Sequence, residues 1–234
     1  MSFITTNQYK LNKSQKEGWV TAGLNLSPAT EARTVLNRPD LPNMCAKSGT
    51  CEKICLKGEG FNAMPTHGLA RARRTAQLFD HWEPTIELIV KEIRNRAKRH
   101  PGRFAFRPNL LSDRADLARR LADALPEIQF YDYTKLGKPH LRVKPNYHLT
   151  FSYSERSSPA EALAILETGV NVAVVFTCRK GEPLPASHWG VPVLDGQKHD
   201  LRFLDPPFHI VGLPFLGSAA ELASGVRGGF VQPL

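Results

Sequence analysis

The chain has few cysteines and no long hydrophobic run. No stretch of about 18 consecutive apolar residues occurs, so a membrane-spanning helix is not expected. The first residues, MSFITTNQYKLNKSQ, lack the apolar core of a secretory signal peptide, which predicts a cytoplasmic protein. No Gly-x-Gly-x-x-Gly follows the first expected strand, so the signature of a dinucleotide-binding fold is missing.

Three of the four cysteines in the 234-residue chain lie close together, at Cys45, Cys51 and Cys55, with the spacing C-x5-C-x3-C. In a reducing cytosol such a group indicates metal ligands or catalytic thiols rather than disulfides. Three thiolates can hold a [4Fe-4S] cluster and leave one iron open to another ligand. Zinc is the alternative and needs a fourth ligand, for which Cys178 is a candidate. A third alternative is that these are reduced thiols with no metal.

Positive charge is in excess, with 31 Lys and Arg against 22 Asp and Glu and a formal net charge of +9. Such a surplus favours contact with DNA or RNA. The basic region begins at Arg71, Arg73 and Arg74 and continues to Arg103, and we predict nucleic-acid contact at its first three arginines. An ordinary solvated helix face is the alternative.

Strand and helix patterns alternate along the chain. Strand patterns cover residues 19–26, 103–107, 128–133, 147–152, 170–176 and 209–213. Helix patterns cover residues 66–79, 84–99, 112–125, 160–168 and 218–224. Regular alternation predicts an α/β fold with a parallel sheet and helices packed outside it. We expect a single domain over 1–234 that forms a partial or irregular (β/α) barrel, with an open parallel α/β sheet as the alternative.

Within this domain three segments differ from the alternating pattern. We expect a flexible N-terminal segment at 1–16, a cysteine-containing loop at 39–65 and a β-rich C-terminal extension at 186–234.

Polar residues follow several of the expected strands. In βα barrels, reactive groups gather at the carboxyl ends of the strands. Lys135 and Glu155 are therefore the candidate catalytic residues. The candidate cofactor-binding residues are Asn109, Ser152 and Ser154.

The three-cysteine loop follows the first strand of the expected βα series, and in this it resembles the radical S-adenosylmethionine (radical SAM) enzymes. There, three cysteines bind a four-iron cluster and S-adenosylmethionine takes the open iron. The usual spacing in that superfamily is C-x3-C-x2-C, against C-x5-C-x3-C here. Gly58-Glu59-Gly60 is only loosely similar to the Gly-Gly-Glu type of cofactor motif. The resemblance implies a [4Fe-4S] cluster and S-adenosylmethionine as cofactors.

A closer resemblance, to the gene-product-88-like family of phage and plasmid proteins, rests on several segments. These are residues 45–60, Tyr133-Thr134-Lys135, and in the tail residues 193–205, 210–213 and 229–231. The family is itself distantly similar to radical-SAM barrels. The resemblance implies a mobile-element protein in the host cytoplasm, where a basic surface meets nucleic acid.

Four acidic or imidazole side chains gather in the tail, at Asp195, His199, Asp200 and Asp205. Together they could bind a divalent metal, as the carboxylates of nucleases do. We favour the other interpretation, a β-hairpin with ion pairs to Lys198 and Arg202.

Taken together, these patterns favour an iron–sulfur, radical-SAM-like enzyme acting on an unknown, nucleic-acid-related substrate. Two alternatives remain open: a nucleic-acid-binding protein without turnover, stabilised by zinc or a structural cluster, and a metal-dependent nuclease.

Overall fold

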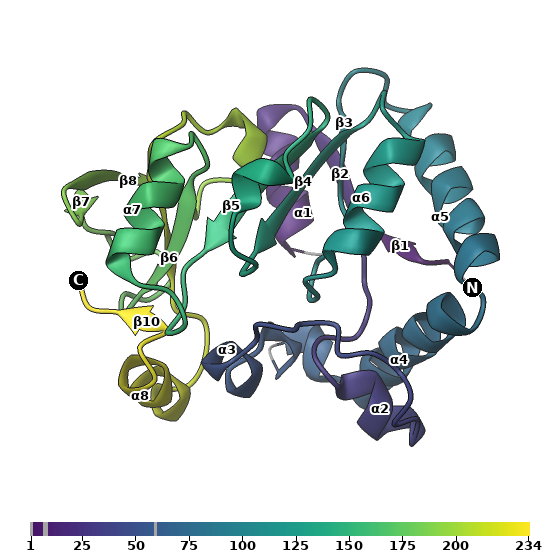
Figure 1. Cartoon of the computed structure of the whole chain (residues 1–234), viewed down its shortest axis with the longest axis horizontal. Helices are drawn as coiled ribbons and strands as arrows, with labels where there is room; N and C mark the ends of the chain where they lie inside the picture. The colour runs from purple at the N-terminus through teal and green to yellow at the C-terminus, as the bar shows by residue number, and fades with distance from the viewer. Residues whose placement is uncertain (1, 7–8, 59) are drawn as a thin grey trace. The chain divides into compact units, whose positions relative to one another are not determined.

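The computed structural model describes residues 2–6, 9–58 and 60–234, and its elements are labelled in Figure 1. Ten strands, most of them paired in parallel, and eight α-helices occur in this described part. The predicted α/β class with parallel strands is confirmed. The choice between a partial barrel and an open sheet stays a prediction.

The chain divides into two compact units. Unit 1 comprises Met1–Ala46, Gly60–Asp132 and Lys144–His148, and unit 2 comprises Lys47–Glu59, Tyr133–Val143 and Leu149–Leu234. The expectation of one domain over the whole chain stays a prediction.

Unit 1 contains the strand order β1-β2-β3-β4. These strands are β1 (Ile4–Thr5), β2 (Val20–Leu24), β3 (Phe104–Arg107) and the first residues of β4 (Gln129–Thr134). β1 is antiparallel to β2, while β2, β3 and β4 are parallel, with Phe106 opposite Phe130. The carboxyl ends of β2, β3 and β4 therefore lie along one edge, where polar groups of parallel sheets gather.

The helices of unit 1 cover this sheet and each other. They are α1 (Tyr9–Lys13), α2 (Glu31–Leu36), α4 (Pro65–Asp80), α5 (Trp82–Ala97) and α6 (Ala115–Ala124). Pro65 occupies the first turn of α4, where a missing N–H costs nothing. Ala32 on α2 packs against Ala72 and Ala76 on α4. α6 buries Leu117 and Leu121, four positions apart on one face.

Unit 2 contains the strand order β5-β6-β9-β8-β7, with β10 paired to β6. The strands are β5 (Tyr147–Ser152, its last four residues in this unit), β6 (Val172–Phe176), β7 (Ser187–His188), β8 (Val191–Asp195), β9 (Ile210–Pro214) and β10 (Val231–Gln232). Only the β7–β8 pair is antiparallel among those described in this unit. The apolar run of β6 is buried in the middle of this order, as a central parallel strand should be.

Three α-helices belong to unit 2: α3 (Thr50–Lys53), α7 (Pro159–Glu167) and α8 (Ala219–Arg227). The Ser158 side chain caps α7 by accepting the N–H of Glu161. α8 begins with a capping box between Ser218 and Glu221. α8 packs against both β10 and α3, which places the cysteine-bearing helix α3 against the C-terminal segment.

The predicted hairpin at residues 195–205 is wrong. β8 ends at Asp195 and pairs in parallel with β9, and a parallel neighbour requires a crossover rather than a tight turn. The segment instead forms a loop and a short 3₁₀ helix over Arg202–Leu204. Its ion pairing does occur, because buried Arg202 lies 3.1 Å from the carboxylate of Asp205.

No helix in the described part of the chain is both long enough and apolar enough to cross a membrane.

Candidate functional site

Cys45 is the cysteine of the loop that belongs to unit 1. It is half-buried, and its N–H donates to Oδ1 of Asn43 at 2.8 Å. Its Sγ donates to the carbonyl oxygen of Leu111 at 3.5 Å. The loop before the first thiol is thus fixed by its own Asx-type turn and by the segment that follows β3.

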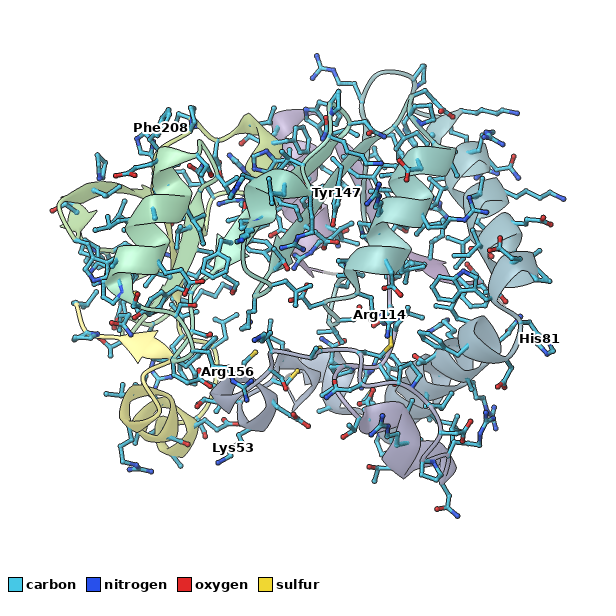
Figure 2. All side chains as sticks on the ribbon, in the orientation of Figure 1. Lys53, His81, Arg114, Tyr147, Arg156 and Phe208 are labelled. Carbon is cyan, nitrogen blue, oxygen red and sulfur yellow. The ribbon has the colours of Figure 1, made fainter. Side chains whose placement is uncertain are left out.

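Cys51 and Cys55 belong to unit 2, where Cys51 lies on α3 and Cys55 follows it. Figure 2 labels Lys53, on the same helix. Both thiols are half-buried, and Cys51 packs against a buried cluster of Ile54, Phe215, Phe230 and Val231. α3 therefore packs on an apolar surface, and this packing stabilises a helix that is too short to be stable alone.

The donor chemistry of the loop fits a thiolate-bound metal. All four cysteines lie in the described part of the chain, and none is in a disulfide. Among the described residues, no three His, Cys, Asp or Glu side chains gather as a metal site would require. The predicted site at Cys45, Cys51 and Cys55 stays a prediction. The Gly58-Glu59-Gly60 motif includes Glu59, which lies outside the described residues.

Cys178 is in different surroundings. Its side chain is 1% exposed and packs in an apolar cluster with Phe176 and Tyr153. Burial raises the pKa of this thiol, and Glu182 raises it further. Metal ligation requires the thiolate, so these surroundings disfavour Cys178 as a fourth ligand.

Two of the predicted strand-end residues come together in unit 2. Lys135 Nζ donates to Oγ of Ser152 at 3.4 Å and lies 5.5 Å from the centre of the Phe230 ring. Ser154 is buried in the turn after β5, where its Oγ accepts the N–H of Arg156 at 3.4 Å. Lys135 and Ser152 can act as one polar pair, whereas Ser154 shapes the turn.

Glu155 contacts the cysteine loop directly. Its Oε1 accepts the backbone N–H of Thr50 at 2.6 Å, immediately before Cys51. Its other oxygen, Oε2, is buried and has no hydrogen-bond partner among the described residues. One oxygen of the predicted catalytic carboxylate is thus already used to hold the start of α3.

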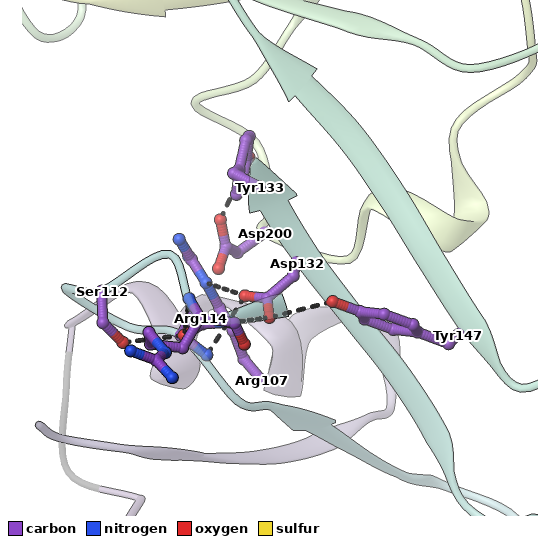
Figure 3. Close-up of polar contacts among 8 residues, drawn as sticks. Arg107, Ser112, Arg114, Asp132, Tyr133, Tyr147 and Asp200 are labelled. Carbon is purple, nitrogen blue, oxygen red and sulfur yellow. Dashed lines mark hydrogen bonds and ion pairs between the residues drawn. The ribbon is translucent and has the colours of Figure 1, made fainter. Parts of the chain in front are cut away.

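Asn109 belongs to a buried polar cluster at the carboxyl ends of β3 and β4. Figure 3 labels three of its other members, Arg107, Asp132 and Tyr147. Its Nδ2 donates to Oδ2 of Asp132 at 2.7 Å, and its backbone N–H donates to Oδ1 at 3.2 Å. Arg107 Nε lies 3.8 Å from Oδ1, and the hydroxyl of Tyr147 donates to Oδ2 at 3.5 Å. Asp132 therefore has three partner residues in unit 1, two at the end of β3 and one on β5.

Asp132 is completely buried. Burial raises its pKa to about 7, against the opposing effects of the Arg107 charge and the Asn109 hydrogen bond. A group that titrates near neutral pH at the strand ends of a parallel sheet has the character of a functional residue.

Sequence reasoning missed Asp132, because the aromatic residues of 128–133 predicted a half-buried strand. Phe130, Tyr131 and Asp132 are in fact all buried, since β4 is covered on both faces. A single acidic residue within an apolar parallel strand is the signal that could have revealed it.

The predicted nucleic-acid contacts differ in their exposure. Arg71 is 1% exposed and forms two hydrogen bonds with Glu31, from Nε at 3.0 Å and from Nη2 at 2.7 Å. A buried, paired guanidinium cannot reach a phosphate, so the expectation for Arg71 does not fit the structure. Arg73 is exposed, while half-buried Arg74 donates from Nε to the carbonyl oxygen of Ser2 at 2.8 Å.

The acidic residues of the tail serve the fold. Oδ1 of Asp195 accepts the N–H of Gln197 at 2.9 Å, which closes a turn. Oδ1 of Asp200 accepts the hydroxyl hydrogen of Tyr133 at 3.3 Å, a contact visible in Figure 3. Asp205 pairs with buried Arg202. Each carboxylate therefore has a structural partner.

No curated protein and no solved structure matches the chain. The family model described as "Gene product 88" matches residues 2–227, which is nearly the whole chain. The chain belongs to the gene product 88 family.

Proposed function

We propose that this chain is an iron–sulfur protein that holds a [4Fe-4S] cluster on Cys45, Cys51 and Cys55. The observation that carries the proposal is the state of these thiols: all three are half-buried, none is in a disulfide, and all lie within the eleven residues 45–55. Cys45 and Cys51 are six residues apart, so the chain between them spans at most about 20 Å. Zinc is the alternative metal, and it would need a fourth ligand.

The finer part of the proposal is a radical-SAM-like enzyme of a phage or mobile element that uses S-adenosylmethionine. When bound, a three-cysteine cluster supplies one-electron chemistry at an iron with an open position. Lys135 and Ser152 would bind an anionic part of the cofactor or substrate, because an ammonium and a hydroxyl already lie side by side. Asn109 would stay in its buried cluster and fix the strand ends rather than bind the cofactor.

The experiment is purification without oxygen, followed by measurement of iron, sulfide and zinc and of the visible spectrum. We expect iron and sulfide close to four of each per chain, the composition of a cubane cluster. Substitution of Cys45, Cys51 or Cys55 by Ala should abolish iron binding, whereas Cys178→Ala should not. Zinc without iron, or neither metal, would contradict the proposal.

The radical-SAM part has its own test. S-adenosylmethionine should shift the EPR spectrum of the reduced cluster, because the cofactor would occupy the open iron. An unchanged spectrum in a protein that does contain the cluster would leave the iron–sulfur proposal in place and remove the enzyme proposal.

A second candidate function is nucleic-acid binding, and one observation favours it. Exposed basic side chains lie on α4, on α5 and in the loop between α5 and β3. Among them are Arg73, Lys91, Lys98, Arg99 and Arg103. Exposed basic side chains can neutralise phosphates and release counterions, so the affinity for nucleic acid should fall steeply with salt. Affinity for a 30-nucleotide DNA measured between 50 and 200 mM salt tests it, and an affinity independent of salt would exclude phosphate contacts as the basis of binding.

A further inference from the structure

The carboxylate of Glu155 meets the first turn of the cysteine helix α3. Oε1 accepts the Thr50 N–H at 2.6 Å, a short distance typical of a charge-assisted hydrogen bond. Thr50 directly precedes Cys51, and Cys55 lies two residues after the last residue of α3, Lys53. The carboxylate therefore fixes the backbone from which both thiols project.

Gly49 makes room for this contact. Its φ is +51°, in the left-handed region that favours glycine. A Cβ at this position would lie 1.9 Å from Oε1 of Glu155 and 3.2 Å from Nε of Arg156, which Figure 2 labels. The Glu155 carboxylate thus occupies the space that any other side chain at residue 49 would need.

α3 also packs closely against the end of α8. A Cβ at Gly228, after α8, would lie 2.6 Å from Oγ1 of Thr50. Ile54 is buried in the apolar cluster with Phe230. α3 has four residues, far below the about 12–15 that an isolated helix needs to be stable in water. Its geometry therefore depends on these neighbours.

We propose that Glu155 is a positioning residue that holds α3 so that Cys51 and Cys55 are presented to a metal. This inference rests on the proposed function of the cysteine loop, and it replaces the catalytic role expected for Glu155 from its strand-end position. Glu155 acts through Thr50 and need not touch the metal or a substrate.

The test measures how fast iodoacetamide alkylates each cysteine in the metal-free full-length protein, by mass spectrometry. Glu155→Ala should accelerate alkylation of Cys51 at least about tenfold, the factor for losing a charge-assisted hydrogen bond that holds a local structure closed. Cys178 is the internal control, because it is buried elsewhere in the same unit and should stay slow. An unchanged rate at Cys51 would overturn the proposal.

Three further variants separate positioning from general destabilisation. Glu155→Gln keeps an acceptor of the same length but loses the charge, so its alkylation rate should lie between those of wild type and Glu155→Ala. Glu155→Asp keeps the charge but is too short, so it should resemble Glu155→Ala. Glu182→Ala removes another carboxylate that accepts a backbone N–H, that of Arg179 at 2.6 Å, and should leave Cys51 unchanged. If Glu155→Ala also accelerates the alkylation of Cys178, the fold of that variant has opened, and Glu155→Asp is used instead. A wild-type alkylation rate at Cys51 in Glu155→Asp would then overturn the proposal.

Metal content then distinguishes this proposal from the proposed function. If the wild-type protein takes up iron, the Glu155→Ala variant should retain less iron per chain than Glu155→Gln. If the wild-type protein binds neither iron nor zinc, the proposed function fails, while the alkylation rates of the metal-free protein still judge the role of Glu155.

Discussion

Asn109 binds both carboxylate oxygens of Asp132, through its side-chain amide at 2.7 Å and its backbone N–H at 3.2 Å. Its own Oδ1 accepts the hydroxyl of Ser112 at 2.8 Å and the N–H of Arg114 at 2.9 Å. One asparagine thus ties the buried acid of β4 to the loop that leads into α6. Protonation of Asp132 should consequently change the stability of unit 1.

The first prediction concerns the pH dependence of stability. The folded-state pKa of Asp132 is raised from 3.8 to about 7, so the folded protein binds this proton more tightly than the unfolded chain does. The corresponding stabilisation is complete below about pH 4 and is lost as the pH rises to 7. Asp132→Asn cannot titrate. The free energy of unfolding of wild type minus that of the variant should therefore fall between pH 5 and pH 7, by up to about 1.4 kcal/mol per unit.

Urea unfolding at several pH values measures this difference. Asp80→Asn is the matched control, because hydrogen bonding from Arg38 lowers the pKa of that exposed carboxyl and moves its titration below the tested range. A wild-type-minus-D132N difference that stays flat or rises from pH 5 to pH 7 would contradict the assignment.

The second prediction concerns the buried ion pair between Arg71 and Glu31. Arg71→Ala leaves the Glu31 carboxylate without its cation and should cost about 3–5 kcal/mol of unfolding free energy. Arg73→Ala, two residues along on the exposed side of α4, should change stability by less than about 0.5 kcal/mol. Chemical denaturation of both variants checks the contrast, and equal small effects would show that the pair contributes little.

The third prediction concerns nucleic-acid affinity. If the exposed basic side chains of α4, α5 and the loop before β3 bind DNA or RNA, the triple substitution of Arg73, Lys98 and Arg99 by Glu should weaken binding. It should also lower the salt dependence by about one unit of log–log slope for each phosphate that the variant no longer neutralises. Conversely, Arg71→Lys should leave the affinity unchanged, because residue 71 is buried. An equally weakened affinity in both proteins would point to unfolding rather than to a change in phosphate binding.

The fourth prediction concerns Cys178. Cys178→Ala creates a small cavity among apolar side chains and should cost about 1 kcal/mol, a typical value for a buried substitution. Iron content per folded chain should not change, because Cys178 is buried among apolar side chains and burial raises the pKa of its thiol, which disfavours the thiolate that a metal requires. A fall in iron equal to that of Cys51→Ala would instead make Cys178 the fourth ligand.

Elements with strong local signals were predictable from the sequence. Periodicity predicts a strand over 147–152, and β5 has those bounds. The helix expected at 66–79 is α4 at Pro65–Asp80, because apolar residues recur on one face of it. The two-residue strands β1, β7 and β10 have no periodicity of their own. They exist because a neighbouring strand offers hydrogen bonds, which a local pattern does not encode.

The candidate site shows the same division. The cysteine spacing alone marks the loop, and Lys135 and Ser152, both expected at strand ends, do lie together. The roles of Glu155 and Asp132 depend on partners distant in sequence, Thr50 for the first and Asn109 and Tyr147 for the second. Neither role could be read from a residue type without those contacts.

The close packing of Thr50 against Gly228 has a consequence for how the protein is made. The cysteine segment is synthesised well before Gly228 and β10, which support α3. Contacts between segments so distant in sequence form late, and until then the thiols project from an unsupported loop. Loading of the proposed metal should therefore follow synthesis of β10, and a nascent protein stalled before α8 should keep Cys51 and Cys55 open to oxidation.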